Sequence, residues 1–248
     1  MNFTKSENRI IYKDDDIIVA VKPAGIPILQ DKLGTKSFQD YICGQIESMN
    51  QNSMTLECDS SISGVATLSA VNRLDRPVGG LVLFSLSARA KAWFAAADSC
   101  LEKNYQVIAQ GQFPSASGGL INYLIHDEKK NISRVIPQKT GRAKRASLSY
   151  EVITEKQDKD KYLSLAEIQL QTGRHHQIRV QLSAIDCPVW GDRKYGKSQM
   201  AGETPHSPAL FSSRLSFKLP GKHDEIKIFE ANPFDWEPEI FGRFNHFD

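Results

Sequence analysis

The stretch NRLDRPVGGL, Asn72–Leu81, places one carboxylate between two guanidinium groups and follows it with a proline and paired glycines. The run that continues it, Gly80–Phe84, has the apolar character of a buried strand reached through a tight turn. Glycines at such a turn allow the backbone to approach another group closely. We therefore interpret Asp75 as a candidate reaction-centre residue. The competing interpretation is an ordinary loop salt bridge with Arg73 or Arg76.

A second informative stretch, TGRHHQIRVQL at Thr172–Leu182, carries several polar donors within one helical turn after a Thr-Gly-Arg bend. Gln177 and Arg179 are therefore expected to point to a shared site. The neighbouring His175 and His176 suggest a metal, but adjacent residues of a helix point about 100° apart, and no third ligand is evident. We predict no metal here; a helix start rich in Arg and His can instead hold phosphate.

The composition is that of a globular chain: 248 residues, of which 40% are hydrophobic and 24% charged. No apolar run approaches the roughly 20 residues needed to cross a bilayer, and the first nine residues lack the apolar centre of a secretory signal. We expect no membrane partner and a cytoplasmic location. No coiled-coil heptads occur, and the chain is long enough for its own core, so we expect a monomer.

The cysteines are scattered along the chain without C-x-x-C spacing, which predicts neither a zinc site nor a disulfide framework. We interpret all of them as free thiols in a reducing compartment. They are Cys43, Cys58, Cys100 and Cys187.

Positive charge is concentrated in one segment although the net charge is only +2. Every charged residue from Lys129 to Arg145 is a cation, and Pro137 and Gly141 indicate a loop or hairpin arm. Such an arm suits a phosphate backbone, while the competing interpretation is a solvated basic loop without a partner. The cations are Lys129, Lys130, Arg134, Lys139, Arg142, Lys144 and Arg145.

Many short strands and few helices are predicted, which indicates an α+β fold with a mostly antiparallel sheet. Strands are expected at Asp16–Lys22, Lys103–Gly111, Ser147–Thr154 and Tyr162–Thr172, the last with a bulge near Ala166. Helices are expected at Thr35–Met49, at Ser87–Leu101 with Ser87 as N-cap, and from about Arg174.

In the helix from Arg174, Ile178, Leu182 and Ile185 form one apolar stripe, which places Arg179 beside its edge. The segment 51–69, rich in Ser, Thr and Gly, is interpreted as a loop insertion. No linker divides the sequence, so we expect one continuous domain.

Ordered along the chain, these motifs resemble those of the RluA-type pseudouridine synthases. The string NRLDRPVGGLVLF at 72–84 is similar to the family signature H-R-L-D-R-x-[TS]-S-G-L-L, and 172–196 resembles T-G-R-x-H-Q-I-R-x-H-L and its continuation. Segment 14–25 looks like the opening strand with its K-P-x-G turn, and 103–111 looks like the K-x-Y strand. With a late strand at 208–220, the resemblance runs from about residue 10 to residue 230.

The resemblance implies a pseudouridine synthase fold, a mostly antiparallel mixed sheet with flanking helices and loops around a central active-site cleft. It implies a single catalytic domain over 1–248, with a basic RNA-binding arm at 129–145. The S4 RNA-binding domain that is usually appended in this family is not expected, since the first core strand begins within about ten residues of Met1. The implied activity is isomerisation of specific uridines in structured RNA, either tRNA or rRNA, without a cofactor.

Catalytic roles follow from the resemblance as expectations. Asp75 matches the family's nucleophile, which attacks the sugar C1′ or the base C6. Arg179 would pair with it and keep it ionised, as a nearby opposite charge does. Tyr105 matches the family's tyrosine, as base or proton relay for C5. The competing interpretation of Tyr105 is a half-buried strand aromatic.

RNA contacts are expected because the target base must leave its stack to react. Arg73 would fill the vacated space or hold a phosphate, with a structural salt bridge as the alternative, and the arm would close over the RNA. The predicted RNA-binding residues are Arg73, Arg76, Arg134, Lys139, Arg142, Lys144, Arg145, Arg174, His176 and Gln177.

Four positions depart from the family pattern: Asn72, Gln181 and Phe211 replace a His, and Gly79 replaces a Ser or Thr. The reacting groups remain, so the leading hypothesis is an active isomerase, and the alternative is a catalytically weak RNA-binding or RNA-folding relative. A glycosidase would need a second carboxylate about 5 Å away. Asp192, in its G-D-x-x-Y-G turn, is interpreted as structural.

Overall fold

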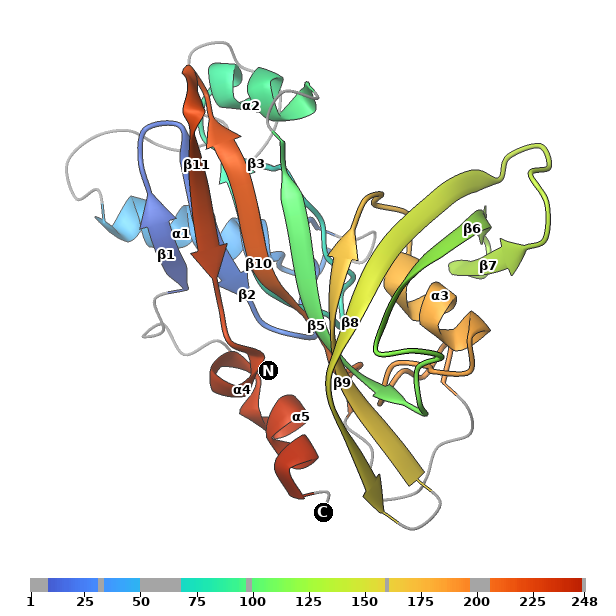
Figure 1. The fold of residues 1–248 in the computed structure, drawn as a ribbon. Helices are drawn as coiled ribbons and strands as arrows, with labels where there is room; N and C mark the ends of the chain where they lie inside the picture. Colours follow the sequence, from blue (N-terminus) through green and yellow to red (C-terminus); the bar gives the residue numbers. More distant parts are fainter. Residues whose placement is uncertain are drawn as a thin grey trace. The chain divides into compact units, whose positions relative to one another are not determined.

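The computed structural model describes residues 9–30, 34–49, 68–96, 100–158, 161–196 and 206–246, whose order along the chain can be followed in Figure 1. The chain divides into two compact units. The first contains Met1–Leu101 and Leu215–Ala231, and the second contains Glu102–Arg214 and Asn232–Asp248. The single catalytic domain stays a prediction. Nearly all of the expected insertion at 51–69 lies outside the described residues.

The first unit is built on two strands that are buried along their whole length. β2 (Ile17–Lys22) and β4 (Gly79–Ser85) pair antiparallel, and neither exposes a residue to solvent. Their nearly continuous apolar sequences fit strands covered on both faces. The remaining strands complete the order β1-β2-β4-β10, with β3 on β4 and β11 on β10. Their bounds are β1 (Ile10–Lys13), β3 (Ser69–Ala70), β10 (Leu210–Leu219) and β11 (Lys222–Glu230).

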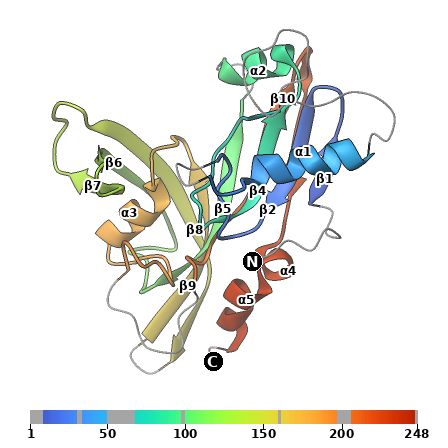
Figure 2. The same ribbon diagram turned by 180° about the vertical axis from the view of Figure 1, so that it is seen from behind.

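Helix α1 (Phe38–Met49) covers one face of this sheet, and Figure 2 shows it lying across β1, β2 and β4. Its buried positions recur at helical spacing, and the rings of Phe38 and Phe84 lie 6.1 Å apart. Helix α2 (Ala88–Ala95) begins at the predicted cap, because the side chain of Ser87 accepts from the backbone of Ala90 at 3.0 Å. It is shorter than predicted, since Ala96 is already extended.

The second unit is a curved sheet in which β5 pairs with β9, β9 with β8, β8 with β6 and β6 with β7, all antiparallel as predicted. Its order is β10-β5-β9-β8-β6-β7. Strand β10 begins in this unit and ends in the first one. The strands are β5 (Glu102–Gln110), β6 (Ser117–Asp127), β7 (Ile132–Ile136), β8 (Lys144–Asp158) and β9 (Lys161–Leu170).

The irregularity expected near Ala166 is present, but the extra residue lies in the partner strand. Val152 pairs with Ala166, and Thr154 pairs with Leu165, so Ile153 is inserted into β8. The register of β8 against β9 therefore shifts by one residue at this point.

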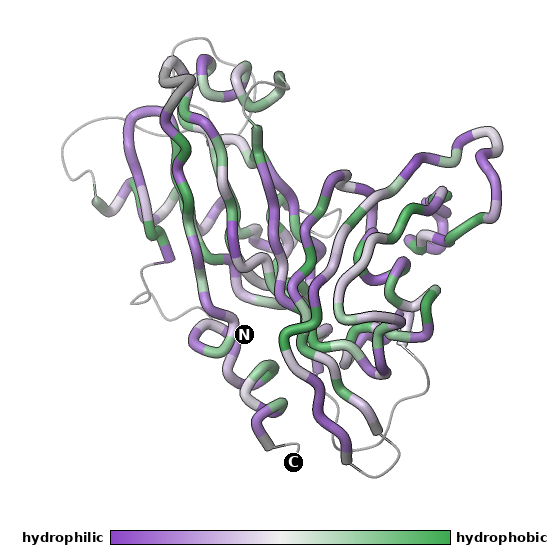
Figure 3. The backbone as a smooth tube through the Cα atoms, viewed as in Figure 1, coloured by the Kyte–Doolittle hydropathy of each residue, from purple (hydrophilic) through white to green (hydrophobic). Residues whose placement is uncertain are grey.

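Helix α3 (Gln177–Ala184) packs against the inner side of this sheet, where Val180 meets Leu124 and Ala146. Where the chain connects β6, β7 and β8, it is mainly hydrophilic, as Figure 3 shows. Three short elements end the described chain: α4 (Pro233–Trp236), α5 (Pro238–Phe241) and a 3₁₀ helix at Gly242–His246.

The free-thiol prediction is confirmed for Cys100 and Cys187 and is wrong for Cys43, which is disulfide-bonded. Spacing could not predict this bond, because disulfides depend on approach in space. Cys58 lies outside the described residues. None of the helices in the described part of the chain is both long and apolar enough to cross a membrane.

Candidate active site

A buried lysine, Lys22, holds the loop that carries Asp75 through a hydrogen bond to its backbone. Asp75 itself is half-buried, and its carbonyl accepts from the backbone of Val78 at 3.0 Å, which closes the turn. Lys22 is fully buried at the end of β2, and its ammonium group satisfies three backbone carbonyls. It donates to the oxygens of Pro23 at 2.9 Å, Ile26 at 2.8 Å and Arg76 at 3.2 Å.

The K-P-x-G turn and the Asp75 loop are also joined directly. The backbone of Gly25 donates to the carbonyl of Arg76 at 2.8 Å, and Nε of Arg76 donates back to the carbonyl of Gly25 at 3.0 Å. Gly25 has a φ of +91°, a conformation that favours glycine. Two motifs that lie about 50 residues apart therefore form one rigid support for the carboxylate. Arg73 and Arg76 are exposed beside it.

Asn72, where the family pattern has His, is buried. Its side-chain amide makes hydrogen bonds to the backbone of β4 of the kind that a neighbouring strand would make. Its amide nitrogen donates to the carbonyl of Leu81 at 3.1 Å, and its amide oxygen accepts from the backbone of Leu83 at 2.7 Å. A primary amide can do both at once, since it carries a donor and an acceptor side by side. The residue therefore closes the base of the loop that contains Asp75.

Tyr105 lies in β5 opposite Ile168 of β9 and is 6% exposed. Lys103 lies two residues earlier, so its side chain is on the same face of the strand. Burial lowers the pKa of the Lys103 ammonium group. The K-x-Y motif therefore places a phenol and a partly desolvated amine side by side on one face.

Arg179 is almost fully buried in α3 and is held by Asp192. Its Nε lies 2.7 Å from Oδ2 and its Nη2 lies 2.8 Å from Oδ1, a bidentate pair with side chains 3% and 0% exposed. Burial alone would raise the pKa of Asp192, but the hydrogen bonds and charge of Arg179, with two backbone N–H groups, outweigh it and lower the pKa. The carboxylate therefore stays ionised and fixes the guanidinium.

The turn around Asp192 is shaped to present this carboxylate. Oδ1 also accepts from the backbone of Lys194 at 2.9 Å and Tyr195 at 3.2 Å. Gly196 donates to the carbonyl of Asp192 at 2.9 Å, and a side chain at Gly196 would come within 2.3 Å of that oxygen. The structural interpretation of Asp192 from the sequence is thus extended, because its particular task is to orient Arg179.

Arg179 does not lie at the edge of an apolar stripe, as periodicity suggested. Six consecutive residues from Gln177 to Leu182 are buried, so α3 has no exposed face over this length. The pair with Asp192 makes this burial possible, because an unpaired guanidinium in that place would be costly. Asp75 belongs to the first unit, whereas Tyr105 and Arg179 belong to the second, so their joint action stays a prediction.

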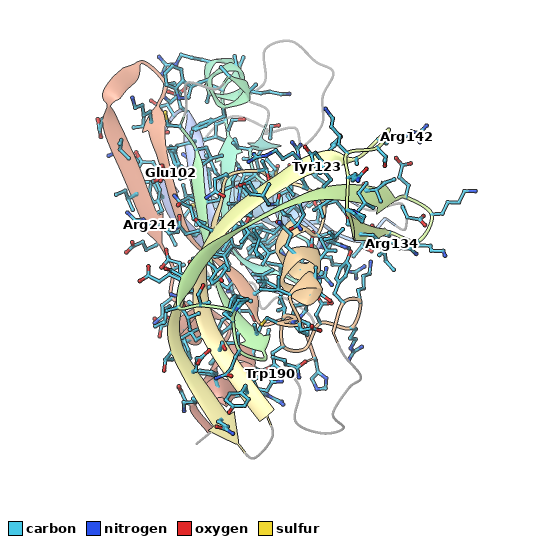
Figure 4. All side chains as sticks on the ribbon, turned by 45° about the vertical axis from the view of Figure 1, so that its right-hand side comes forward. Glu102, Tyr123, Arg134, Arg142, Trp190 and Arg214 are labelled. Atoms are coloured by element: carbon cyan, nitrogen blue, oxygen red, sulfur yellow. The ribbon has the colours of Figure 1, made fainter. Side chains whose placement is uncertain are left out.

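The predicted RNA-binding cations of the arm are exposed on β7, on β8 and on the loop between these strands. Figure 4 shows Arg134 and Arg142 extending from this region, with Tyr123 on the neighbouring strand β6. Arg174 is also exposed, and its Nε donates to the carbonyl of Arg145 at 3.0 Å, which brings those two predicted residues together. Strands β7 and β8 both pair with β6 and not with each other, so the arm consists of β7, an exposed loop and the start of β8. Its RNA contacts stay a prediction.

Two other predicted RNA-binding residues are buried and already engaged within the protein. The amide oxygen of Gln177 accepts from Thr172 Oγ1 and from the backbone of Arg174, and its nitrogen donates to the carbonyl of Ser147. His176 has a left-handed φ of 54°, and its Nδ1 lies 2.8 Å from the hydroxyl of Tyr195. Their contact with RNA stays a prediction.

Three histidine rings stack on one another. The ring centroids of His126 and His175 lie 3.9 Å apart, and those of His175 and His176 lie 3.7 Å apart. Within the described ranges, no group of three His, Cys, Asp or Glu side chains is arranged to hold a metal.

Comparison with known proteins identifies the class. Residues 16–184 match the family model described as RNA pseudouridylate synthase, which covers more than half of the 248 residues. The chain belongs to this family. It is therefore an enzyme of the isomerase type that modifies RNA, and the RluA-type resemblance is confirmed.

Particular relatives support this assignment. The ribosomal large subunit pseudouridine synthase D of Zymomonas mobilis subsp. mobilis is 31% identical over 239 residues, covering 92% of this chain and 70% of that protein. The ribosomal large subunit pseudouridine synthase C of Rickettsia bellii is 28% identical over 228 residues, covering 88% and 67%. Human RNA pseudouridylate synthase domain containing 1 has a TM-score of 0.70 at 18% identity, covering 94% and 87%. That likeness confirms the predicted fold.

Two roles were missed by sequence reasoning. The pairing of Asp192 with Arg179 and the contact of Tyr195 with the arm both depend on the G-D-x-x-Y-G turn. The signal was the turn itself, in which an acid and a phenol follow a buried arginine by 13 and 16 residues.

Proposed function

We propose that this enzyme isomerises specific uridines in structured RNA to pseudouridine, with Asp75 as the nucleophile. The target nucleotide leaves its stack and enters the site before reaction. Arg179 pairs with Asp75 and keeps it ionised, and Tyr105 acts as the base or proton relay at C5. RNA is the one partner that the reaction requires, since no external reactant is consumed.

The reaction balances within one nucleotide. The carboxylate of Asp75 forms a bond to C1′ or to C6, and the N1–C1′ bond breaks with its electron pair left on the base. The base turns, C5 joins C1′, and the bond to Asp75 is released. The C5 proton departs through Tyr105, and N1 gains a proton, so that the product is an isomer of the substrate.

The observation that supports this proposal most directly is the support of the Asp75 loop. A fully buried Lys22 joins the carbonyl of Arg76 in this loop to the carbonyl of Ile26 after the K-P-x-G turn, and Asn72 closes the base of the loop. A surface salt bridge would not need a buried ammonium group beneath it, because such pairs contribute little. A nucleophile does need a fixed position relative to its target atom.

We propose large-subunit ribosomal RNA as the first substrate to test, because the relatives from Zymomonas mobilis and Rickettsia bellii act on that RNA by their names. Transfer RNA is the second. The basic arm would hold the phosphate backbone through Arg134, Lys139, Arg142, Lys144 and Arg145. We propose that the enzyme acts as a monomer in the cytoplasm.

The test is pseudouridine mapping of ribosomal and transfer RNA from cells that carry the intact gene, an Asp75→Asn version or an Asp15→Asn version. Asp15 is an exposed carboxylate of the same unit and serves as the matched control. We expect one or a few sites to be lost with Asp75→Asn and retained with Asp15→Asn. Removing a covalent nucleophile lowers the rate by several orders of magnitude.

The alternative, a relative that works by binding RNA, gives the opposite pattern. The modification map would then be the same for all three versions, and a cellular phenotype of gene deletion would be rescued by Asp75→Asn. Asn72 gives this alternative little support, because its amide replaces the family's imidazole in a structural role at the base of the loop.

A further inference from the structure

Tyr195 lies between the catalytic arginine and the basic arm, and both ends of its side chain are engaged. Its ring stands beside Arg179, with Cζ of the guanidinium 5.3 Å from the ring centroid. The ring also packs against the cluster of Leu124, Ala146 and Val180, which joins β6, β8 and α3. The face of this ring therefore helps to define where the guanidinium lies.

The hydroxyl of Tyr195 is held by the arm. It accepts from the backbone N–H of Ser133, near the start of β7, at 2.8 Å, and it lies 2.8 Å from Nδ1 of His176. Ser133 is 2% exposed, so this N–H has no access to water. A buried N–H needs its acceptor, and this bond therefore ties the position of β7 to that of the phenol.

A parallel connection joins the same turn to the tip of the β6–β7 hairpin. Nζ of Lys194 donates to the carbonyl of Asn131 at 2.9 Å, and Oδ1 of Asn131 lies 2.9 Å from Nε2 of His175. The turn is also tied to α3, because Oγ of Ser183 donates to the carbonyl of Tyr195 at 2.8 Å. A displacement of the arm must therefore move the turn that carries Asp192.

We propose that Tyr195 is a positioning residue that couples the basic arm to Arg179. RNA that binds to the arm fixes β7, β7 fixes the phenol through the N–H of Ser133, and the phenol with Asp192 fixes the guanidinium. This coupling rests on the proposed function, since it assigns the arm to RNA and Arg179 to catalysis. It makes the maximal rate depend on contacts remote from the reacting base.

The first test compares Tyr195→Phe with Tyr162→Phe, a half-buried tyrosine of β9 in the same unit. Tritium release from large-subunit ribosomal RNA labelled with [5-³H]uridine is measured in single turnovers at saturating enzyme. We expect Tyr195→Phe to lower the maximal rate about tenfold, because two ordinary hydrogen bonds disappear while the ring remains. RNA affinity should change less than about twofold, and Tyr162→Phe should change neither.

A double-mutant cycle separates coupling from a general loss of structure. Arg134→Ala with Arg142→Ala should lower both RNA affinity and the maximal rate in the intact enzyme. In the Tyr195→Phe background the same pair should lower affinity alone, because the route to Arg179 is already broken. Fully additive effects on the maximal rate would overturn the coupling.

Hydrogen exchange of the full chain provides a readout that does not require activity. Binding of the same ribosomal RNA should protect the amides of β7 and of residues 192–196 in the intact enzyme. In Tyr195→Phe, protection should persist in β7 and vanish in the turn; in Lys194→Met, which leaves the phenol of Tyr195 intact, protection of the turn should weaken partially. Equal protection of the turn in all three proteins would overturn the proposal.

The outcomes distinguish the two proposals. If the intact enzyme releases no tritium while RNA still protects β7 and the turn together, the proposed function fails and the mechanical coupling stands. If tritium is released and Tyr195→Phe behaves as Tyr162→Phe does, the coupling fails and the function stands. RNA that leaves β7 unprotected would remove the arm as its contact and overturn the coupling as stated.

Discussion

At the scale of single residues, the support of Asp75 depends on the buried side chains of Lys22 and Asn72. Asn72 shows this most clearly, because its amide pairs with the backbone of β4 at both Leu81 and Leu83. At this departure from the family pattern, the amide of Asn72 closes the loop through two hydrogen bonds to β4. The departure leaves the carboxylate in place.

The Asn72→Ala substitution should lower the free energy of unfolding by about 2 kcal/mol, because the carbonyl of Leu81 and the N–H of Leu83 lose their hydrogen-bond partners. Urea denaturation of the purified proteins measures this difference. Asn104→Ala is the control, since its amide pairs with the half-buried Glu167. A loss no larger than that of the control would contradict the structural role of Asn72.

The Lys22→Met substitution should lower the free energy of unfolding by about 2–4 kcal/mol, since three backbone carbonyls lose a charged donor. The maximal rate should fall more than RNA affinity does, because the loop that positions Asp75 is loosened. Lys91→Met, at an exposed position of α2, serves as the matched control. Denaturation together with single-turnover kinetics gives both quantities, and an unchanged rate would show that Asp75 needs no such support.

The positions of Asp75, Tyr105 and Arg179 in a turn, a strand and a helix followed from the sequence motifs. The burial of Arg179 did not, because hydrophobic periodicity scores an arginine as exposed and cannot see its partner. That partner, Asp192, lies beyond the end of α3 in a separate turn. Pairing across a turn is a property of the tertiary fold.

At the scale of elements, the arm illustrates what charge patterning predicts well. A segment in which every charge is positive cannot pack against itself, so it extends into solvent, and the structure shows strands β7 and β8 with an exposed connection.

The lengths of helices are less predictable from the sequence. Helix α2 ends at Ala95, whereas apolar spacing predicted a helix to Leu101, because such spacing indicates which face is buried and does not fix the residue at which a helix ends.

Removing arm cations should weaken RNA binding evenly across RNA sequences. Arg134→Ala and Arg142→Ala should each reduce the slope of log K against log salt by roughly 0.7 to 0.9 for every phosphate that is no longer neutralised. Filter binding of ribosomal RNA at several salt concentrations measures the slope, with Lys13→Ala, on β1, as the control. An unchanged slope would assign the RNA contacts to another surface.

At the scale of the whole molecule, stability should fall in acid through the Arg179–Asp192 pair. The folded-state pKa of Asp192 is lowered, so the stability contributed by its ionised form is complete above the ordinary carboxyl pKa and is lost as the pH falls through the folded value. We expect the urea midpoint to decline below about pH 4.

Asp192→Asn provides the comparison for this pH dependence. It should be less stable by about 3–5 kcal/mol at neutral pH, because it leaves a buried guanidinium without its counter-charge. Its midpoint should also depend less on pH in the acid range. Parallel curves for the two proteins would show that other carboxylates cause the decline.

Strand β10 begins in one unit and ends in the other, and each unit takes its last segment from the final part of the chain. During synthesis, the first hundred residues therefore leave the ribosome without β10 and β11, which they need to complete their sheet. Contacts between segments so distant in sequence form slowly. A nascent chain of this protein therefore exposes open strand edges until β10 and β11 have been made, and we expect its yield in cells to depend on chaperones.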